Sequence, residues 1–278
     1  MRDFNGTIGL IATDLDGTLL DTSMTFTERD RAALGRCIAK GIHVVVATGR
    51  SLTSVPQAVR DIEGIEALIC VNGAKIYDNK TEEPLYARYL SREAIESVWD
   101  LINADDVMCE VFTGGRPYVS AACFDDLARY GIPDWFAAYA RRSRRPVDDL
   151  ISFTSDHLDA IENINFNFGD EATRLRLLNR LSGSGLYELT SAFPFNYEIG
   201  GVGVNKAEAI DFLCRRLGVP PAETMCFGDN VNDVGMIRYA GIGVAMGDAA
   251  PEAREAADFV TLAGGRNGIA HAIDRFIP

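Results

Sequence analysis

The stretch IGLIATDLDGTLL, residues 8–20, decides the fold of this chain. It opens with the apolar run Ile8–Thr13, which ends at two acidic residues, Asp14 and Asp16, followed by Gly17. An apolar run of this length predicts a buried β-strand. Positions i and i+2 of an extended chain project to the same side, so both carboxylates leave the strand end together. An Asp-Gly turn that caps a helix is the alternative for this segment taken alone.

The residues that follow alternate between helical and strand-like patterns. Residues 27–40 place apolar side chains on one side of a helix, and Ile42–Ala47 is a β-branched run typical of a strand buried on both faces. A second helical segment precedes a third apolar run, Ala67–Val71. This order predicts a parallel, doubly wound sheet of the Rossmann-like α/β class. Asn72-Gly73 then predicts a tight hairpin.

The alternation of helical and strand-like segments returns after about residue 200. Residues 205–217 carry apolar residues at helical spacing, which predicts an amphipathic helix. The segments that follow predict strands at 224–227, 242–245 and 258–261 and helices at 231–240 and 267–276.

The middle of the chain has a different pattern, in which paired strand-like segments alternate with helices. Such a pattern predicts an α+β insert. Turn-forming residues near Lys80–Pro84 and Thr190–Pro194 place its boundaries. We therefore expect a core domain of residues 1–83 and 191–278, interrupted by a second domain of residues 84–190.

The composition is that of an ordinary globular protein, with 47% hydrophobic and 24% charged residues. No window reaches the ~18 consecutive apolar residues of a membrane span, and the N-terminus lacks a signal-peptide pattern, so we expect a cytoplasmic protein without a membrane partner. The net charge of −13 argues against a nucleic-acid partner, because Lys and Arg hold phosphate backbones. The six Cys lack CxxC spacing, so neither a zinc site nor a disulfide framework is expected.

Two further polar segments suit an anion. Thr48-Gly49 follows the 42–47 strand, where a hydroxyl and free backbone N–H groups form a site for phosphate oxygens. Taken alone, however, a Thr-Gly pair after a strand is usually a simple turn. Asn205 and Glu208 predict a capping box, which places Lys206 at the first helical position. A cation there opposes the helix dipole, and a bound anion would remove the conflict. A surface lysine is the alternative.

The last polar segment, Gly228–Asp233, follows the 224–227 strand. Asp229 and Asp233 lie one turn apart if a helix begins there, so both can face one cation. Oxygen ligands without His or thiolate favour Mg²⁺. Helix capping by one Asp or Asn is the alternative, but four polar residues exceed that need. All four segments follow predicted parallel strands and would meet at one edge of one sheet.

In order, spacing and context, these segments resemble the haloacid dehalogenase superfamily, and within it the Cof-type phosphatases with a type IIB cap. The resemblance covers nearly the whole chain and implies a Rossmann-like core with a cap domain inserted after the third core strand. It rests on the segments DLDGTLL (14–20), ATGR (47–50), VNGAKIYD (71–78), GVNK (203–206), GDNVNDVGM (228–236) and GVAMGDA (243–249).

The resemblance implies a Mg²⁺-dependent phosphatase of small phosphorylated metabolites, in particular sugar phosphates, that works as a monomer or a homodimer. It implies that Asp14 is the nucleophile and Asp16 the general acid/base. The implied phosphate-binding groups are Thr48, Lys206, Asn232 and the backbone at Leu15 and Gly49. The implied metal ligands are the Asp14 carboxylate, the Asp16 carbonyl and Asp229, with Asp233 acting through water.

The chain departs from the family pattern at Ala207, where Gly is common, and at Asp248, where Asn is common. Two other functions stay open, a phosphomutase of the phosphomannomutase type and a non-catalytic phosphometabolite-binding protein. Specificity is expected to come from the insert. Its basic run, residues 141–145, is expected to be a solvated helix end, where cations complement the helix dipole.

Overall fold

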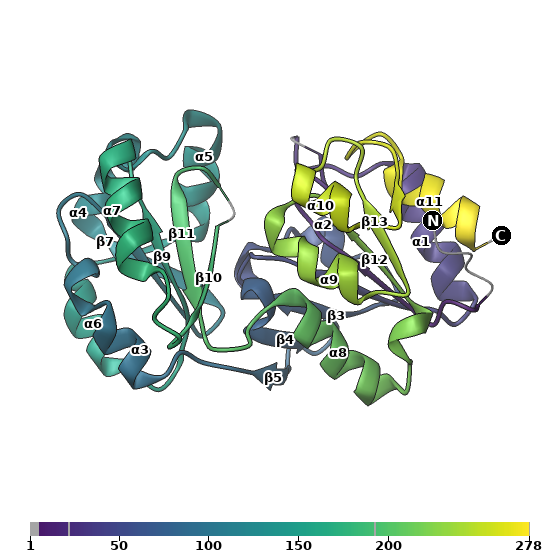
Figure 1. Ribbon diagram of the computed structural model, residues 1–278, viewed down its shortest axis with the longest axis horizontal. Helices are drawn as coiled ribbons and strands as arrows, with labels where there is room; N and C mark the ends of the chain where they lie inside the picture. Colours follow the sequence, from purple (N-terminus) through teal and green to yellow (C-terminus); the bar gives the residue numbers. More distant parts are fainter. Residues whose placement is uncertain (1–5, 22, 192, 278) are drawn as a thin grey trace. The chain divides into compact units, whose positions relative to one another are not determined.

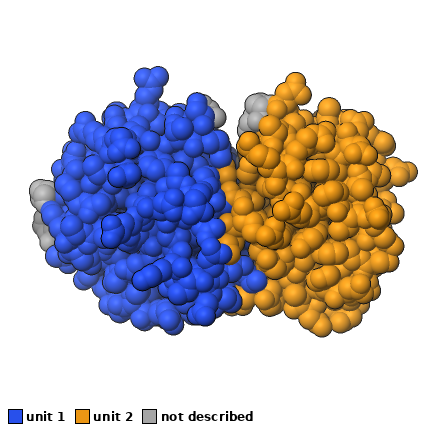
Figure 2. Space-filling model, turned by 180° about the vertical axis from the view of Figure 1, so that it is seen from behind, with its two compact units in different colours: residues 1–49, 55–86, 205–278 blue, residues 50–54, 87–204 orange. Residues whose placement is uncertain are grey.

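The computed structural model of the protein describes residues 6–21, 23–191 and 193–277 (Figure 1). The chain divides into two compact units, which Figure 2 shows in different colours. Unit 1 comprises residues 1–49, 55–86 and 205–278, and unit 2 comprises residues 50–54 and 87–204.

The unit boundaries differ from the expected ones at two places. The strand β11 (Asn196–Gly200) pairs with β9 (Ile161–Asn167), so the chain stays in unit 2 as far as Val204 rather than leaving it at residue 190. Residues 50–54 also group with unit 2, where the Thr53 hydroxyl donates to the carbonyl of Gly115 at 3.1 Å. Neither pairing has a local signal, because each joins residues far apart in the chain.

Unit 1 is built on an eight-stranded sheet whose strand order is β14-β13-β12-β1-β2-β3-β4-β5. The strands from β14 to β3 run parallel, and β4 turns back antiparallel to β3 across the predicted hairpin. The strands are β1 (Leu10–Thr13), β2 (His43–Ala47), β3 (Ile65–Cys70), β4 (Lys75–Asp78), β5 (Pro84–Ala87), β12 (Thr224–Gly228), β13 (Ile242–Ala245) and β14 (Phe259–Val260). The central position of β1, between β12 and β2, brings three of the predicted polar segments to neighbouring strand ends.

Helices cover this sheet, as expected for a doubly wound fold. The amphipathic helix α8 begins after Asn205, whose side chain accepts from the backbone N–H of Glu208, and ends at Gly218 in the left-handed conformation. Its apolar side packs on Leu10 and Ala12 of β1. The helices are α1 (Glu28–Ala39), α2 (Gln57–Arg60), α8 (Lys206–Leu217), α9 (Val234–Tyr239), α10 (Pro251–Ala256) and α11 (Gly268–Phe276). The predicted helix 231–240 is split, because a 3₁₀ turn, Val231–Asp233, precedes α9.

Unit 2 contains a six-stranded, mostly antiparallel sheet of order β10-β11-β9-β6-β7-β8. Its remaining strands are β6 (Met108–Thr113), β7 (Arg116–Ser120), β8 (Arg145–Val147) and β10 (Glu188–Thr190). Its helices are α3 (Arg92–Ser97), α4 (Ala121–Asp125), α5 (Asp134–Ser143), α6 (Leu150–Asp156) and α7 (Glu171–Leu181). The α/β core and the α+β insert are thus confirmed as fold class.

The expectation for the basic run 141–145 is wrong at Arg144. This side chain is buried, and its guanidinium pairs with both carboxylate oxygens of Glu110, at 2.8 and 3.2 Å. It also lies over the rings of Phe136 and Tyr139.

Among the described residues, no helix has both the length and the apolar character that a membrane span requires.

Candidate active site

Asp14 occupies the end of the central strand of unit 1. It directly follows β1, and its backbone N–H donates to the carbonyl of Phe227 in β12 at 2.9 Å. The residue is only 6% exposed. A carboxylate at this position has left water, so its charge needs a partner nearby.

Lys206 supplies that partner. Its ammonium group lies 2.5 Å from Asp14 Oδ1 and 2.7 Å from Asp233 Oδ1, and the side chain is almost fully buried. The prediction that Lys206 begins a helix is confirmed for α8, whereas the alternative of a surface lysine is wrong. The sequence pattern predicted that Lys206 follows a parallel strand, and this prediction is wrong. Lys206 follows β11, which is antiparallel to β9 in the sheet of unit 2.

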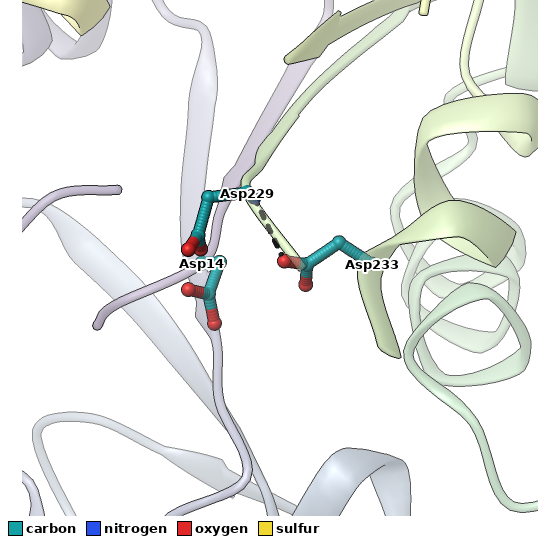
Figure 3. Close-up of side chains that lie close together, drawn as sticks. All are labelled: Asp14, Asp229 and Asp233. Atoms are coloured by element: carbon teal, nitrogen blue, oxygen red, sulfur yellow. Dashed lines mark hydrogen bonds between the residues drawn. The ribbon is translucent and has the colours of Figure 1, made fainter. Parts of the chain in front are cut away.

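Asp229 and Asp233 complete a cluster of carboxylates with Asp14, shown in Figure 3. One ligand oxygen from each of the three lies within 4.8 Å of the others. Asp233 also accepts from the backbone N–H groups of Asp229 and Asn230, at 2.9 and 3.0 Å. The expected turn therefore forms, and it holds Asp233 against the end of β12.

The cluster has a strong excess of negative charge. Burial and the Asp233 carboxylate raise the pKa of Asp14 well above its usual value, although Lys206 acts in the opposite direction. Burial and Asp233 also raise the pKa of Asp229 to about 6. Burial alone lowers the pKa of Lys206, but Asp14 and Asp233 outweigh that effect, and the net shift is upward. One ammonium thus faces three carboxylates, which is an arrangement that a bound cation would stabilise.

The donor set fits a hard divalent cation. Asp14, Asp229 and Asp233 offer only carboxylate oxygens, and the described residues around them contribute neither His nor Cys to the group. Oxygen-only ligands suit Mg²⁺ or Ca²⁺ rather than zinc.

The turn after Asp14 brings further groups toward Asp229. Asp16 is exposed, and Gly17 adopts a positive φ of 82° while its N–H donates to the Leu20 carbonyl. A Cβ on Gly17 would lie 2.5 Å from Asp229 Oδ2, so only glycine fits there. Thr18, which the sequence reasoning missed, donates through its hydroxyl to Asp229 Oδ1 at 3.1 Å.

Thr48 and Gly49 lie at the end of β2, beside β1. Thr48 is buried, and its N–H donates to the carbonyl of Ile69 while its own carbonyl accepts from the N–H of Asn72. Asn232 donates through its side chain to Asn72 Oδ1 at 3.0 Å. Asn72 thus connects two predicted phosphate-binding segments. The sequence pattern showed Asn72 only as a hairpin residue.

Comparison with known proteins extends this picture. A model of haloacid dehalogenase-like hydrolases matches residues 11–273. The chain belongs to this family.

The relatives include two phosphatases of Bacillus subtilis (strain 168). The 5-amino-6-(5-phospho-D-ribitylamino)uracil phosphatase YcsE is 30% identical over 275 residues, 97% of this chain and 96% of the relative. The phosphatase YwpJ is 29% identical over 287 residues, 96% of this chain and 99% of the relative.

Solved structures of the haloacid dehalogenase-like hydrolase family show the same fold. One from B. subtilis has a TM-score of 0.84 at 26% identity and covers 97% of this chain and 100% of that chain. The structure of a HAD subclass IIB sugar phosphatase has a TM-score of 0.80 at 24% identity. The match covers 96% of this chain and 98% of that chain, and it shows that the two share a fold. The predicted family and the prediction of a phosphatase are confirmed.

Proposed function

We propose that this phosphatase hydrolyses small phosphorylated metabolites through an aspartyl-phosphate on Asp14, with Mg²⁺ as cofactor. The observation that carries the proposal is the buried contact of Asp14 with Lys206, beside Asp229 and Asp233. A nucleophile for phosphorus must be ionised and must not repel the phosphate. An adjacent buried ammonium supports both requirements.

The reaction would proceed in two steps. In the first, a carboxylate oxygen of Asp14 forms a bond to phosphorus while the bond from phosphorus to the ester oxygen breaks, and Asp16 donates a proton to that oxygen. In the second, Asp16 takes a proton from water, whose oxygen attacks phosphorus, and inorganic phosphate leaves as the Asp14 carboxylate is restored. The exposure of Asp16 suits this role, because it has to reach both the leaving group and water.

The other predicted residues would hold the phosphoryl group and the metal. Lys206, Thr48, Asn232 and the backbone N–H groups of Leu15 and Gly49 are the proposed donors to phosphoryl oxygens. Asp14, the Asp16 carbonyl and Asp229 are the proposed ligands of Mg²⁺, which when bound neutralises charge on those oxygens. Asp233 already accepts from Lys206 and from two backbone N–H groups, which supports a contact through water rather than a direct one.

The names of the relatives guide the choice of substrate class. One relative is named for a phosphorylated ribitylamino compound, and another from Klebsiella pneumoniae (strain 342) is named an HMP-PP phosphatase. We propose sugar phosphates and related polyol phosphates as substrates, with the insert as the cap that selects among them. A cytoplasmic location and a monomeric or homodimeric state stay predictions.

Steady-state release of inorganic phosphate from a broad panel of phosphorylated metabolites tests the proposal. The expected result is multiple turnovers with Mg²⁺ and without any activating bisphosphate. A phosphomutase would require such a bisphosphate and release little phosphate, and a binding protein would bind without release. Either outcome would overturn the proposed hydrolysis.

A further inference from the structure

Gly17 adjoins two groups of the proposed metal site. Its N–H donates to the carbonyl of Leu20 at 2.9 Å. The peptide unit that carries this N–H also carries the Asp16 carbonyl, and because a peptide unit is planar, the bond to Leu20 fixes the direction of that carbonyl. The space beside the Cα of Gly17 is filled by the Asp229 carboxylate, since a Cβ there would lie 2.5 Å from Oδ2. A shift of Gly17 would therefore disturb both proposed ligands together.

Gly264 lies against Gly17, although the two residues are far apart in the chain. A Cβ on Gly264 would lie 2.3 Å from the carbonyl oxygen of Gly17 and 2.9 Å from its carbonyl carbon. Atoms that are not bonded to one another do not approach so closely, so any larger residue at position 264 would displace one of the two backbones. The place of Gly264 therefore affects the place of Gly17.

The side chain of Asp248 holds Gly264. Its Oδ1 accepts from the N–H of Gly264 at 3.2 Å. Gly264 and its neighbours Ala263 and Gly265 line a hollow of about 380 Å³, together with Gly17 and Asp248. A segment of such small side chains beside open space makes few apolar contacts, so its position depends on hydrogen bonds more than on packing.

The backbone near Asp248 also contacts Asp229. Ala250, two residues further along the chain, donates its N–H to the Asp229 carbonyl at 2.7 Å. The contacts thus form a closed cycle, in which Ala250 binds the carbonyl of Asp229 and Gly17 adjoins its carboxylate. Asp248 joins these two sides through Gly264. We call this arrangement the contact cycle.

We propose that Asp248 is a positioning residue of this phosphatase. Through the two glycines it holds the Asp16 carbonyl and the Asp229 carboxylate where both can face one cation. The inference rests on the proposed function, which takes these two groups as ligands of Mg²⁺. The acceptor atom Oδ1, and not the charge of Asp248, carries the effect. A carboxamide offers the same acceptor, so the departure from Asn, the residue common at this position in the family, leaves the contact intact.

Substitutions of Asp248 with a matched control test this role. Asp248→Ala removes the acceptor, and Asp248→Asn keeps it. The control is Asp258→Ala, because the Asp258 carboxylate also accepts from one backbone N–H, that of Gly243 in β13 at 3.1 Å. This control removes a contact of the same kind in unit 1 but outside the contact cycle.

A second pair of variants tests the glycine contact itself. In Gly264→Ala protein the new methyl group has to displace the Gly17 carbonyl. Gly241→Ala is the matched control, because a Cβ there would lie 2.1 Å from the carbonyl oxygen of Ala222, which lies outside the contact cycle. The Asp248 variants decide the proposal by themselves where Gly264→Ala protein does not fold.

Three quantities are measured for each variant. Calorimetric titration with Mg²⁺ gives its dissociation constant, thermal unfolding without metal gives Tm, and hydrolysis of 4-nitrophenyl phosphate at saturating Mg²⁺ gives kcat and KM. The titration reports on the ligands without any turnover. Comparison of Tm with the dissociation constant separates a positioning role from a loss of stability.

Asp248→Ala should raise the Mg²⁺ dissociation constant roughly three- to tenfold, which corresponds to the loss of one hydrogen bond. It should lower kcat while KM stays nearly unchanged, because the positioned groups act in the transition state. Asp248→Asn should restore both quantities, and Gly264→Ala should exceed Asp248→Ala in effect. The controls Asp258→Ala and Gly241→Ala should lower Tm and leave the Mg²⁺ dissociation constant unchanged.

An unchanged Mg²⁺ dissociation constant and an unchanged kcat in folded Asp248→Ala protein would overturn the positioning role. An equal loss in Asp258→Ala protein, or no recovery in Asp248→Asn protein, would overturn it as well.

Failure of the proposed function has a different signature. If the unaltered protein binds Mg²⁺ but releases no phosphate from any substrate, the proposed hydrolysis is refuted, and weaker Mg²⁺ binding in Asp248→Ala protein still supports the positioning role. If the unaltered protein hydrolyses 4-nitrophenyl phosphate without binding Mg²⁺, the proposed cofactor is refuted. A lower kcat in Asp248→Ala protein that Asp248→Asn restores would then support positioning of Asp16.

Discussion

At the scale of single residues, the site depends on one ammonium and the carboxylates around it. Lys206 contacts both Asp14 and Asp233, while Asp229 is oriented by Thr18. Burial, followed by the nearby Asp233 carboxylate, raises the pKa of both Asp14 and Asp229. Removal of one carboxylate should therefore be tolerated by the fold more readily than removal of the ammonium.

Asp14→Asn should abolish turnover while the protein stays folded. The amide is a far poorer nucleophile, so kcat should fall by at least ~10³-fold. Lys206 keeps Asp233 as its partner, so the far-UV circular dichroism spectrum should match that of the unaltered protein. Phosphate release within tenfold of the unaltered protein would contradict the assignment of Asp14 as the nucleophile.

At the scale of elements, a buried ion pair connects two strands of unit 2 that are distant in sequence. Arg144 immediately precedes β8, and Glu110 lies in the middle of β6. Neither is more than 8% exposed at its side chain, so each charge depends on the other. Such a pair specifies one arrangement of the strands, because any other would leave a charge buried alone.

Arg144→Met should destabilise the protein by about 3–5 kcal/mol, because Glu110 is left as an uncompensated buried charge. The double variant Glu110→Gln/Arg144→Met should recover much of that loss, since no charge remains. Urea unfolding of the two single variants and the double variant measures the coupling between the residues. Additive effects of the two substitutions would show that the pair does not act as a unit.

At the scale of the whole molecule, metal binding should couple activity to stability. Asp14, Asp229 and Asp233 come from two segments of unit 1 more than 200 residues apart, and they come together only in the folded chain. A cation that binds this cluster therefore binds the folded state and raises the unfolding free energy, by about 2.7 kcal/mol at a concentration of 100 Kd.

Treatment with EDTA should remove phosphatase activity, and Mg²⁺ should restore it and raise Tm. Ca²⁺ should also raise Tm but support little turnover, because its larger and looser coordination shell positions the nucleophile poorly. In Asp229→Asn protein, Mg²⁺ should leave Tm nearly unchanged, which serves as the control. Full activity in metal-free protein would exclude Asp229 as a required ligand.

The sequence by itself determined the fold class, the family and the segments of the site. Buried parallel strands appear as β-branched runs such as Ile42–Ala47, and α8 appears as an amphipathic pattern with a capping residue, because both are local properties of the chain. Because these patterns are local, they do not reveal which distant segments pair with one another. Strand β11 belongs to unit 2 through its pairing with β9, which is distant in sequence, and this pairing places the boundary of unit 2 at Val204.

Only the tertiary structure decided which polar residues are buried, and against what. A basic run is usually solvated, but Arg144 is buried because Glu110 lies across the sheet from it. Thr18 and Asn72 join the site through contacts with Asp229 and Asn232, which are separated from them by well over a hundred residues. Burial and pairing of polar groups depend on partners distant in sequence, so no local pattern contains them.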